Sequence, residues 1–198
     1  MIQTLLDFIS RLISPRPSPD EHEADGVTHT PTLPTPLPPV KVEEPPVLVT
    51  DQLTPNFHLR EFTRSATALA HGLDNTPTTA HRENLLRLAK TLESVRLLLA
   101  HPILISSGYR SAQLNQLVGG SATSDHALGL AADFTCPGYG SVEDVCRAIA
   151  DSSIPFDQLI FEQGGTHWVH LGIGARMRRQ TLSWSPKTKY VNGIRRLS

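Results

Sequence analysis

Proline is concentrated at one end of this 198-residue chain, and that distribution most limits which part of it can fold. Ten of the 16 prolines lie in residues 1–50, and only six lie in the remainder of the chain. Proline removes a backbone donor and restricts the residue before it, so a segment this rich in proline is poorly suited to helices or central strands. We therefore expect residues 14–50 to be a Pro-rich disordered linker and residues 51–198 to form the folded domain.

The first thirteen residues have a pattern of their own. Apolar side chains recur there at spacings of three and four, which predicts a short amphipathic helix over residues 1–13. A helix of about twelve residues is marginal by itself in water, so we expect it to dock on another protein or to self-associate. Lying on a membrane surface is the alternative, although the segment is not enriched in basic residues. It also lacks the positive start and unbroken apolar stretch of a secretory signal, so we expect synthesis in a bacterial cytoplasm without export by this route.

The folded part mixes helical and strand patterns without regular alternation. The expected helices span residues 79–99, 111–118 and 141–150, and the expected strands span residues 103–107, 130–134, 157–162 and 167–173. This order predicts an α+β fold, with a small, mostly antiparallel sheet flanked by helices. The sequence has no run of eighteen apolar residues, which excludes a transmembrane segment, and its two cysteines exclude a disulfide framework or a four-cysteine zinc site.

The last part of the chain, residues 171–198, carries seven basic side chains and no acidic ones. A segment of this charge can bind along an anionic polymer, or it can form a solvated, positively charged rim. Only Trp184 and Tyr190 interleave with the basic residues, so we expect no specific binding of nucleic acid.

Three side chains stand out as candidate metal ligands. His126 lies in a stretch rich in glycine and other small residues, and Asp133 and His170 each interrupt an otherwise apolar strand. Two imidazoles and one carboxylate form a donor set that suits zinc, with a fourth position left for water. From spacing alone, ordinary hydrogen-bonded residues are the alternative interpretation.

Two blocks of sequence carry a resemblance to a known family. The segments "SSGYRSAQLNQLVGGSATSDHALGLAADF" (106–134) and "FDQLIFEQGGTHWVHLG" (156–172) resemble the M15 zinc peptidases, in particular the D-alanyl-D-alanine carboxypeptidase-like subgroup common in bacteriophages. The shared elements are S-G-Y-R-S, G-G-S, S-x-H-x-x-G-x-A-x-D and W-V-H, in that order. The resemblance covers about residues 55–175 and implies a fold of the hedgehog and DD-peptidase type.

The resemblance also implies roles for individual residues. His126, Asp133 and His170 match the ligands of one Zn²⁺ ion. Arg110 matches the arginine that holds a substrate oxygen or carboxylate, and its planar fork suits that task. Ser124 matches a serine in the wall of the site that hydrogen-bonds the substrate. Gly129, in the loop between the first two ligands, matches a small residue that lets the chain turn tightly.

The general base is the point at which this sequence departs from the family pattern. Better-known members have an acidic residue three positions before the last ligand, where this chain has His167. An imidazole can accept a proton near neutral pH, but strand alternation turns His167 away from His170. Glu162, at the end of the preceding strand, is the other candidate, and a base elsewhere stays open. Trp168 shares the face of His170 and either forms a pocket wall or simply packs.

The function implied by the resemblance is zinc-dependent hydrolysis of peptide bonds in the stem peptides or cross-links of peptidoglycan, by a bacteriophage-encoded carboxypeptidase or endopeptidase. We expect such a protein to act at the cell wall or periplasm, either during lysis or as part of a virion. Two alternatives remain. The chain could be a non-catalytic module that binds cell walls, or a virion structural protein that retains the peptidase fold.

Overall fold

The computed structural model describes residues 51–197, so the expected helix 1–13 and linker 14–50 lie outside the described residues. The helices are α1 (Leu59–Thr63), α2 (Ala66–Ala70), α3 (Thr79–Leu99), α4 (Ala112–Leu117), α5 (Val142–Asp151) and the 3-10 turn η1 (Asp125–Leu128). The strands are β1 (Gln52–Thr54), β2 (Phe57–His58), β3 (Leu104–Ser107), β4 (Ala131–Thr135), β5 (Gln158–Gln163), β6 (His167–Gly172), β7 (Gln180–Ser185) and β8 (Lys189–Asn192). Within residues 51–197, no helix has both the length and the apolar character needed to cross a bilayer.

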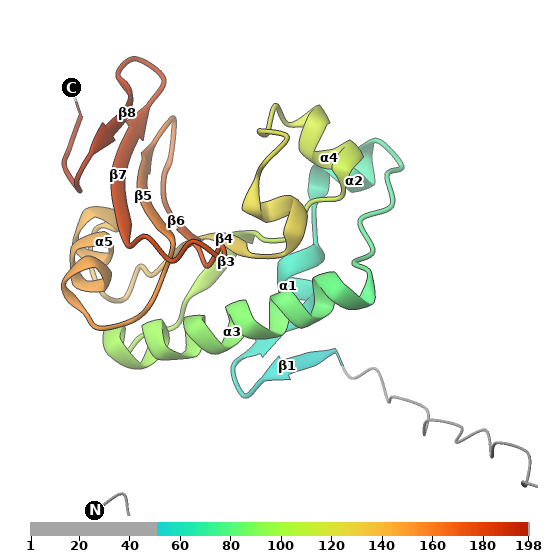
Figure 1. The fold of residues 1–198 in the computed structure, drawn as a ribbon, viewed down its shortest axis with the longest axis horizontal. Helices are drawn as coiled ribbons and strands as arrows, with labels where there is room; N and C mark the ends of the chain where they lie inside the picture. The colour runs from blue at the N-terminus through green and yellow to red at the C-terminus, as the bar shows by residue number, and fades with distance from the viewer. Residues whose placement is uncertain (1–50, 198) are drawn as a thin grey trace, which may run out of the picture. The chain divides into compact units, whose positions relative to one another are not determined.

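The main sheet has six strands in the order β3-β4-β6-β5-β7-β8 (Figure 1). All neighbours in it are antiparallel except β5 and β7, which run parallel. A separate two-stranded ribbon, β1–β2, leads into α1. This architecture confirms the predicted α+β fold with a mostly antiparallel sheet.

Helix α3 supplies much of the core. It begins where Thr78 accepts a hydrogen bond from the backbone N–H of His81, and it ends before Ala100, which adopts a left-handed conformation ahead of Pro102. Its apolar face is at most 2% exposed and consists of Leu85, Leu88, Ala89, Leu92, Val95 and Leu99. The helical period in the sequence therefore identifies the buried face correctly.

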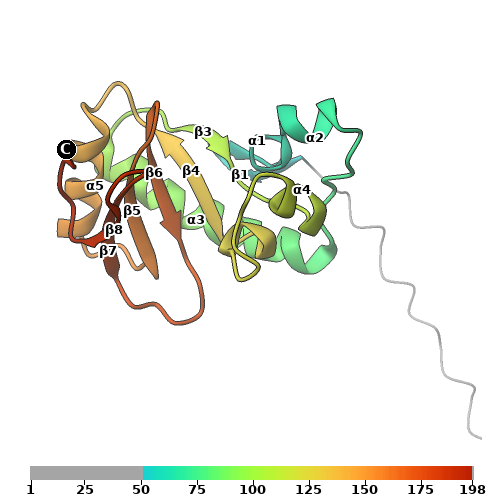
Figure 2. The same ribbon diagram turned by 90° about the horizontal axis from the view of Figure 1, so that it is seen from above.

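The two faces of the sheet have different surroundings. Ile105, Phe134, Val169 and Phe161 are cross-strand neighbours that belong to the same buried cluster as the apolar faces of α3 and α5. Figure 2 shows α5 and α3 beside the sheet, with α1, α2 and α4 gathered at the β3–β4 end. Because side chains alternate along a strand, the residues between these core positions face away from the helices. That second face carries the candidate site.

Residues 171–198 contain two strands that are not among those expected from the sequence, β7 and β8, which complete the sheet. All seven basic residues of this segment are exposed. Arg178 forms an ion pair with buried Asp157, with an Nη2–Oδ2 distance of 2.7 Å. Arg179 donates hydrogen bonds to three carbonyl groups after α5 and near its end, and lies 4.6 Å from the centre of the Phe156 ring. These two basic groups are thus structural partners of the fold.

Candidate metal centre

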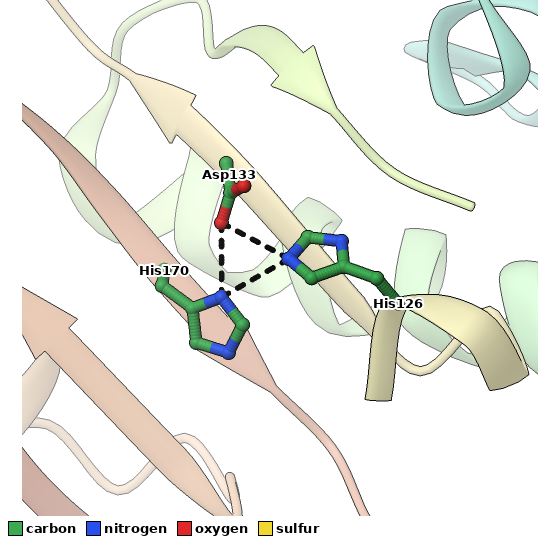
Figure 3. Close-up of side chains that lie close together, drawn as sticks. All are labelled: His126, Asp133 and His170. Atoms are coloured by element: carbon green, nitrogen blue, oxygen red, sulfur yellow. Dashed lines mark hydrogen bonds and ion pairs between the residues drawn. The ribbon is translucent and has the colours of Figure 1, made fainter. Parts of the chain in front are cut away.

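Strand register brings two of the three predicted ligands side by side. Asp133 on β4 is the direct cross-strand partner of His170 on β6. His126 comes from η1, whose chain turns through Gly129 and enters β4 two residues later. The three side chains converge, as Figure 3 shows.

The distances between the donor atoms fit a single cation. His126 Nε2 lies 3.2 Å from Asp133 Oδ1 and 3.2 Å from His170 Nδ1, and the latter two atoms are 2.9 Å apart. Four ligands at about 2.0–2.1 Å from a zinc ion would be separated by about 3.3 Å in a tetrahedron, so one ion can contact all three atoms. His126, Asp133 and His170 therefore form a group able to hold a metal ion.

The hydrogen bond at the far side of the His126 ring decides which nitrogen is free. His126 Nδ1 lies 2.7 Å from the carbonyl oxygen of Gly108, which only accepts, so Nδ1 carries the proton and donates. Nε2 is then a lone-pair atom that faces the other two ligands. Burial lowers the pKa of His126, which keeps the ring neutral and able to bind a metal.

The backbone around Gly108 has little freedom. A Cβ atom at this position would lie 2.6 Å from the carbonyl oxygen of Phe62 in α1. Only glycine allows this close approach, which places the Gly108 carbonyl against His126. Arg110 N also donates to the His126 carbonyl at 3.1 Å, so the loop after β3 and η1 hold each other.

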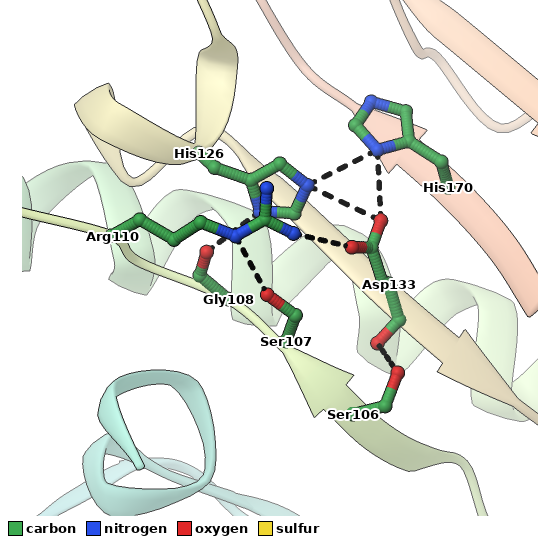
Figure 4. A network of polar contacts seen from close by, with 7 residues as sticks. All are labelled: Ser106, Ser107, Gly108, Arg110, His126, Asp133 and His170. Carbon is green, nitrogen blue, oxygen red and sulfur yellow. Dashed lines mark hydrogen bonds and ion pairs between the residues drawn. The ribbon is translucent and has the colours of Figure 1, made fainter. Parts of the chain in front are cut away.

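Asp133 is held as a carboxylate by partners on several sides (Figure 4). Burial alone would raise its pKa, but the interactions with His126 and His170 outweigh burial and lower it. Arg110 Nη2 donates to Asp133 Oδ2 at 2.8 Å, while Arg110 Nε donates to Ser107 Oγ at 3.0 Å. Because Arg110 holds Oδ2, the other oxygen, Oδ1, is directed at the two histidines.

A cleft of about 590 Å³ lies over this group. Glu162 lines it from β5, together with all three candidate ligands and Arg110. Burial raises the pKa of Glu162 to about 7, with His170 acting in the opposite direction. A half-buried carboxyl group that titrates near neutral pH beside a metal group is suited to accept and return a proton.

The structure separates the two candidates for the base. Glu162 is the cross-strand partner of Trp168, two residues from His170 along β6, and therefore shares the face of His170. His167 begins β6 on the opposite face, where it is exposed and its ring meets Phe161 edge-on at 5.6 Å. The fold thus brings Glu162 to the cleft and does not bring His167 there.

The remaining predicted residues also lie around the cleft. Ser124 is in its wall at the start of η1, and Trp168 lies between this cleft and a second cavity of about 730 Å³. Gly129 has φ +70°, and a Cβ there would lie 2.9 Å from the His81 carbonyl oxygen. Trp184 and Tyr190 also line the cleft, although neither is among the site residues predicted from the sequence. The signal was present, because the alternation in "TLSWS" (181–185) is typical of a strand.

Comparison of the sequence with known protein families gives a match that covers most of the cleft residues described above. A family model described as Peptidase M15 matches residues 55–172, which is more than half of the chain. The match includes His126, Asp133, Glu162 and His170, and it ends before β7. No curated protein matches the chain.

Proposed function

The chain belongs to the M15 peptidases, a family of metallopeptidases, and on that premise we propose that it cleaves peptide bonds in the stem peptides or cross-links of bacterial peptidoglycan with one zinc ion. The observation that supports this proposal is the convergence of His126, Asp133 and His170 beneath a cleft that also contains Glu162. The resemblance of residues 106–134 and 156–172 to phage enzymes supports a bacteriophage origin.

His126 Nε2, Asp133 Oδ1 and His170 Nδ1 would hold the metal. When bound, a zinc ion supplies a Lewis acid that polarises the scissile carbonyl and makes water more acidic. Glu162 accepts a proton from the attacking water at a carboxylate oxygen and delivers it to the nitrogen of the leaving amine. With its pKa near 7, Glu162 is suited to both halves of this transfer.

Arg110 is the cleft residue that would orient the substrate. Two of its five N–H groups are bound to Asp133 and Ser107, which fixes the plane of the guanidinium. The other three remain for a substrate carbonyl or carboxylate, and they provide positive charge where negative charge develops on the substrate oxygen. Ser124 supplies a further hydroxyl group in the cleft wall.

The test uses purified cell walls and the full-length chain. We expect the protein to lower the turbidity of a wall suspension and to release new amino groups, a chelator to abolish both, and added zinc to restore both. His126→Ala and His170→Ala should lose bound zinc and activity, whereas His71→Ala, at an exposed position outside the cleft, should retain both. Protein that carries zinc and sediments with walls but releases no amino groups would instead be a non-catalytic wall-binding module.

Residues 1–13 are proposed to dock the enzyme on a protein partner or on a second copy, on the strength of their apolar stripe. A virion is one assembly in which such docking would place the enzyme at the cell wall. Deletion of residues 1–50 should leave hydrolysis intact while detaching the protein from that assembly. Unchanged attachment after the deletion would argue against this role.

A further inference from the structure

A row of aromatic side chains extends the cleft beyond the metal centre. Trp168 on β6, Glu162 on β5, Trp184 on β7 and Tyr190 on β8 are successive cross-strand partners, so they form one row across the sheet. All four line the same cleft. The Trp184 and Tyr190 rings are neighbours, with centroids 6.4 Å apart and planes at 49°. Tyr190 is 60% exposed, which leaves much of its ring open to a ligand.

From this row we infer that Trp184 and Tyr190 form a saccharide subsite, which binds a sugar ring of the glycan to which the stem peptide is attached. This inference rests on the proposed function. The C–H groups on one face of a pyranose ring carry a weak positive charge and pack on the negative face of an aromatic ring. Sugar hydroxyl groups also need polar partners, and Glu162, the cross-strand partner of Trp184, provides one within the cleft.

The charges of the cleft favour a neutral ligand over a nucleic acid. Three arginines line it, Arg110, Arg176 and Arg178, but three carboxylates line it too, Asp125, Asp133 and Glu162. Two of the arginines are bound by Asp133 and by buried Asp157. Glu162 also lies within the aromatic row itself, where it would repel a phosphate backbone.

The distance between the two sites matches a stem peptide. Trp184 is two strands and two residues away from His170 across the sheet, about 12 Å by ordinary strand spacings. Extended peptide covers this distance in about three or four residues. A peptide that runs from a sugar on Trp184 to the metal centre would therefore be cut several residues from the glycan.

The subsite also lies outside the matched family region. Trp184 and Tyr190 belong to β7 and β8, whereas the family match ends at residue 172. The aromatic pair is thus carried by strands that hold neither the three candidate ligands nor Glu162. We expect it to add affinity for the glycan to a peptidase centre.

Tryptophan fluorescence gives a direct test, because the chain has only two tryptophans and both lie in this row. The zinc-loaded full chain is titrated with the peptide-free disaccharide N-acetylglucosaminyl-N-acetylmuramic acid. The lactyl carboxyl group of the disaccharide is capped as the methylamide, so that the ligand is neutral, as it is when linked to the stem peptide. We expect a saturable change in emission that Trp184→Phe reduces and Tyr190→Ala weakens. Tyr139→Ala, which alters an exposed aromatic residue outside the cleft, is the control and should titrate as the unaltered chain does.

The second measurement compares two substrates, a free stem pentapeptide and the same peptide linked to the disaccharide. The unaltered enzyme should have the higher kcat/KM for the linked substrate, and Trp184→Ala should reduce that preference at least fivefold, through KM. Cleavage of both substrates with equal efficiency, or an emission change with a thymidine oligonucleotide instead of the disaccharide, would refute the subsite and leave the peptidase assignment intact. Failure to cleave either substrate while the disaccharide binds would refute the peptidase assignment alone.

Discussion

Replacing Glu162 by glutamine tests two properties of this side chain separately, its role in catalysis and its effect on the stability of the fold. Glutamine keeps the shape of the side chain but can neither accept the proton of water nor return it to the leaving amine. Loss of a general base typically lowers the rate about 10²- to 10⁴-fold, so we expect kcat to fall by that factor. Zinc binding should persist, because Glu162 is not one of the three ligand candidates.

The pH dependence follows from the pKa of Glu162, which burial raises to about 7. Only the carboxylate form accepts a proton, so kcat/KM should rise about tenfold per pH unit below the midpoint and level off above it. A bound cation favours the carboxylate, which moves the midpoint of the zinc enzyme below 7. Glu162→Gln should remove this acid limb.

The same carboxyl group should destabilise the metal-free protein at high pH. Its pKa is higher in the folded chain, about 7 against 4.5, so between these values the folded state binds more protons and stability falls as the pH rises. At most this amounts to about 3 kcal/mol, and partial solvation reduces it to about 1–2 kcal/mol. Metal-free Glu162→Gln should therefore be more stable than the unaltered chain at pH 8 and equally stable at pH 4.5.

The assays are zinc-dependent release of amino groups between pH 5 and pH 9, and urea unfolding of the metal-free protein at pH 4.5 and pH 8. His167→Gln is the matched control, because it alters the other candidate base on the opposite face of β6. We expect it to change kcat less than twofold. Glu162 is not the base if Glu162→Gln retains activity with its acid limb, or if His167→Gln abolishes activity while zinc stays bound.

Three substitutions test the packing around the site, each by urea unfolding of the metal-free protein. Gly108→Ala should cost about 2–3 kcal/mol, because its Cβ would clash with the Phe62 backbone. Asp157→Asn should cost about 2–3 kcal/mol at pH 7 by breaking the pair with Arg178. Since Arg178 lowers the pKa of Asp157, this difference should disappear as the pH falls below about 4. Leu92→Ala, in the fully buried face of α3, should cost about 2–5 kcal/mol.

Local patterns predicted the elements that depend on nearby residues. Helix α3 carries its own start signal at Thr78 and an apolar period that matches its buried face, so its bounds could be read directly. Asp133 and His170 were visible because each breaks an apolar strand. The alternation in residues 181–185 is typical of a strand, but nothing local shows that β7 pairs in parallel with β5, with β6 between them in the sequence. Likewise, Arg178 finds its partner Asp157 21 residues earlier.

The candidate site also depends on contacts between residues that are far apart in the sequence. The carbonyl group that sets the protonated nitrogen of His126 belongs to Gly108, 18 residues away, and depends on the approach of α1. No spacing rule identifies such a contact. The position of Glu162, the proposed base, is likewise a property of the β5–β6 register, which places it opposite Trp168. A shift of one residue would turn Glu162 into the core and away from the cleft.

That register is braced beside Glu162 by the C-terminal segment. Gln163 is the next residue on β5, buried on the opposite face, and its amide donates to the Arg195 carbonyl at 3.0 Å and accepts from the Leu197 N–H at 2.9 Å. If the Gln163 amide lost both partners, its buried polar atoms would be left without hydrogen bonds, which is costly. The side chain would then have to leave the interior, and the end of β5 would move with it. Arg195 and Leu197, although far from the candidate ligands in sequence, thus help to keep the carboxylate of Glu162 on the cleft face of the sheet.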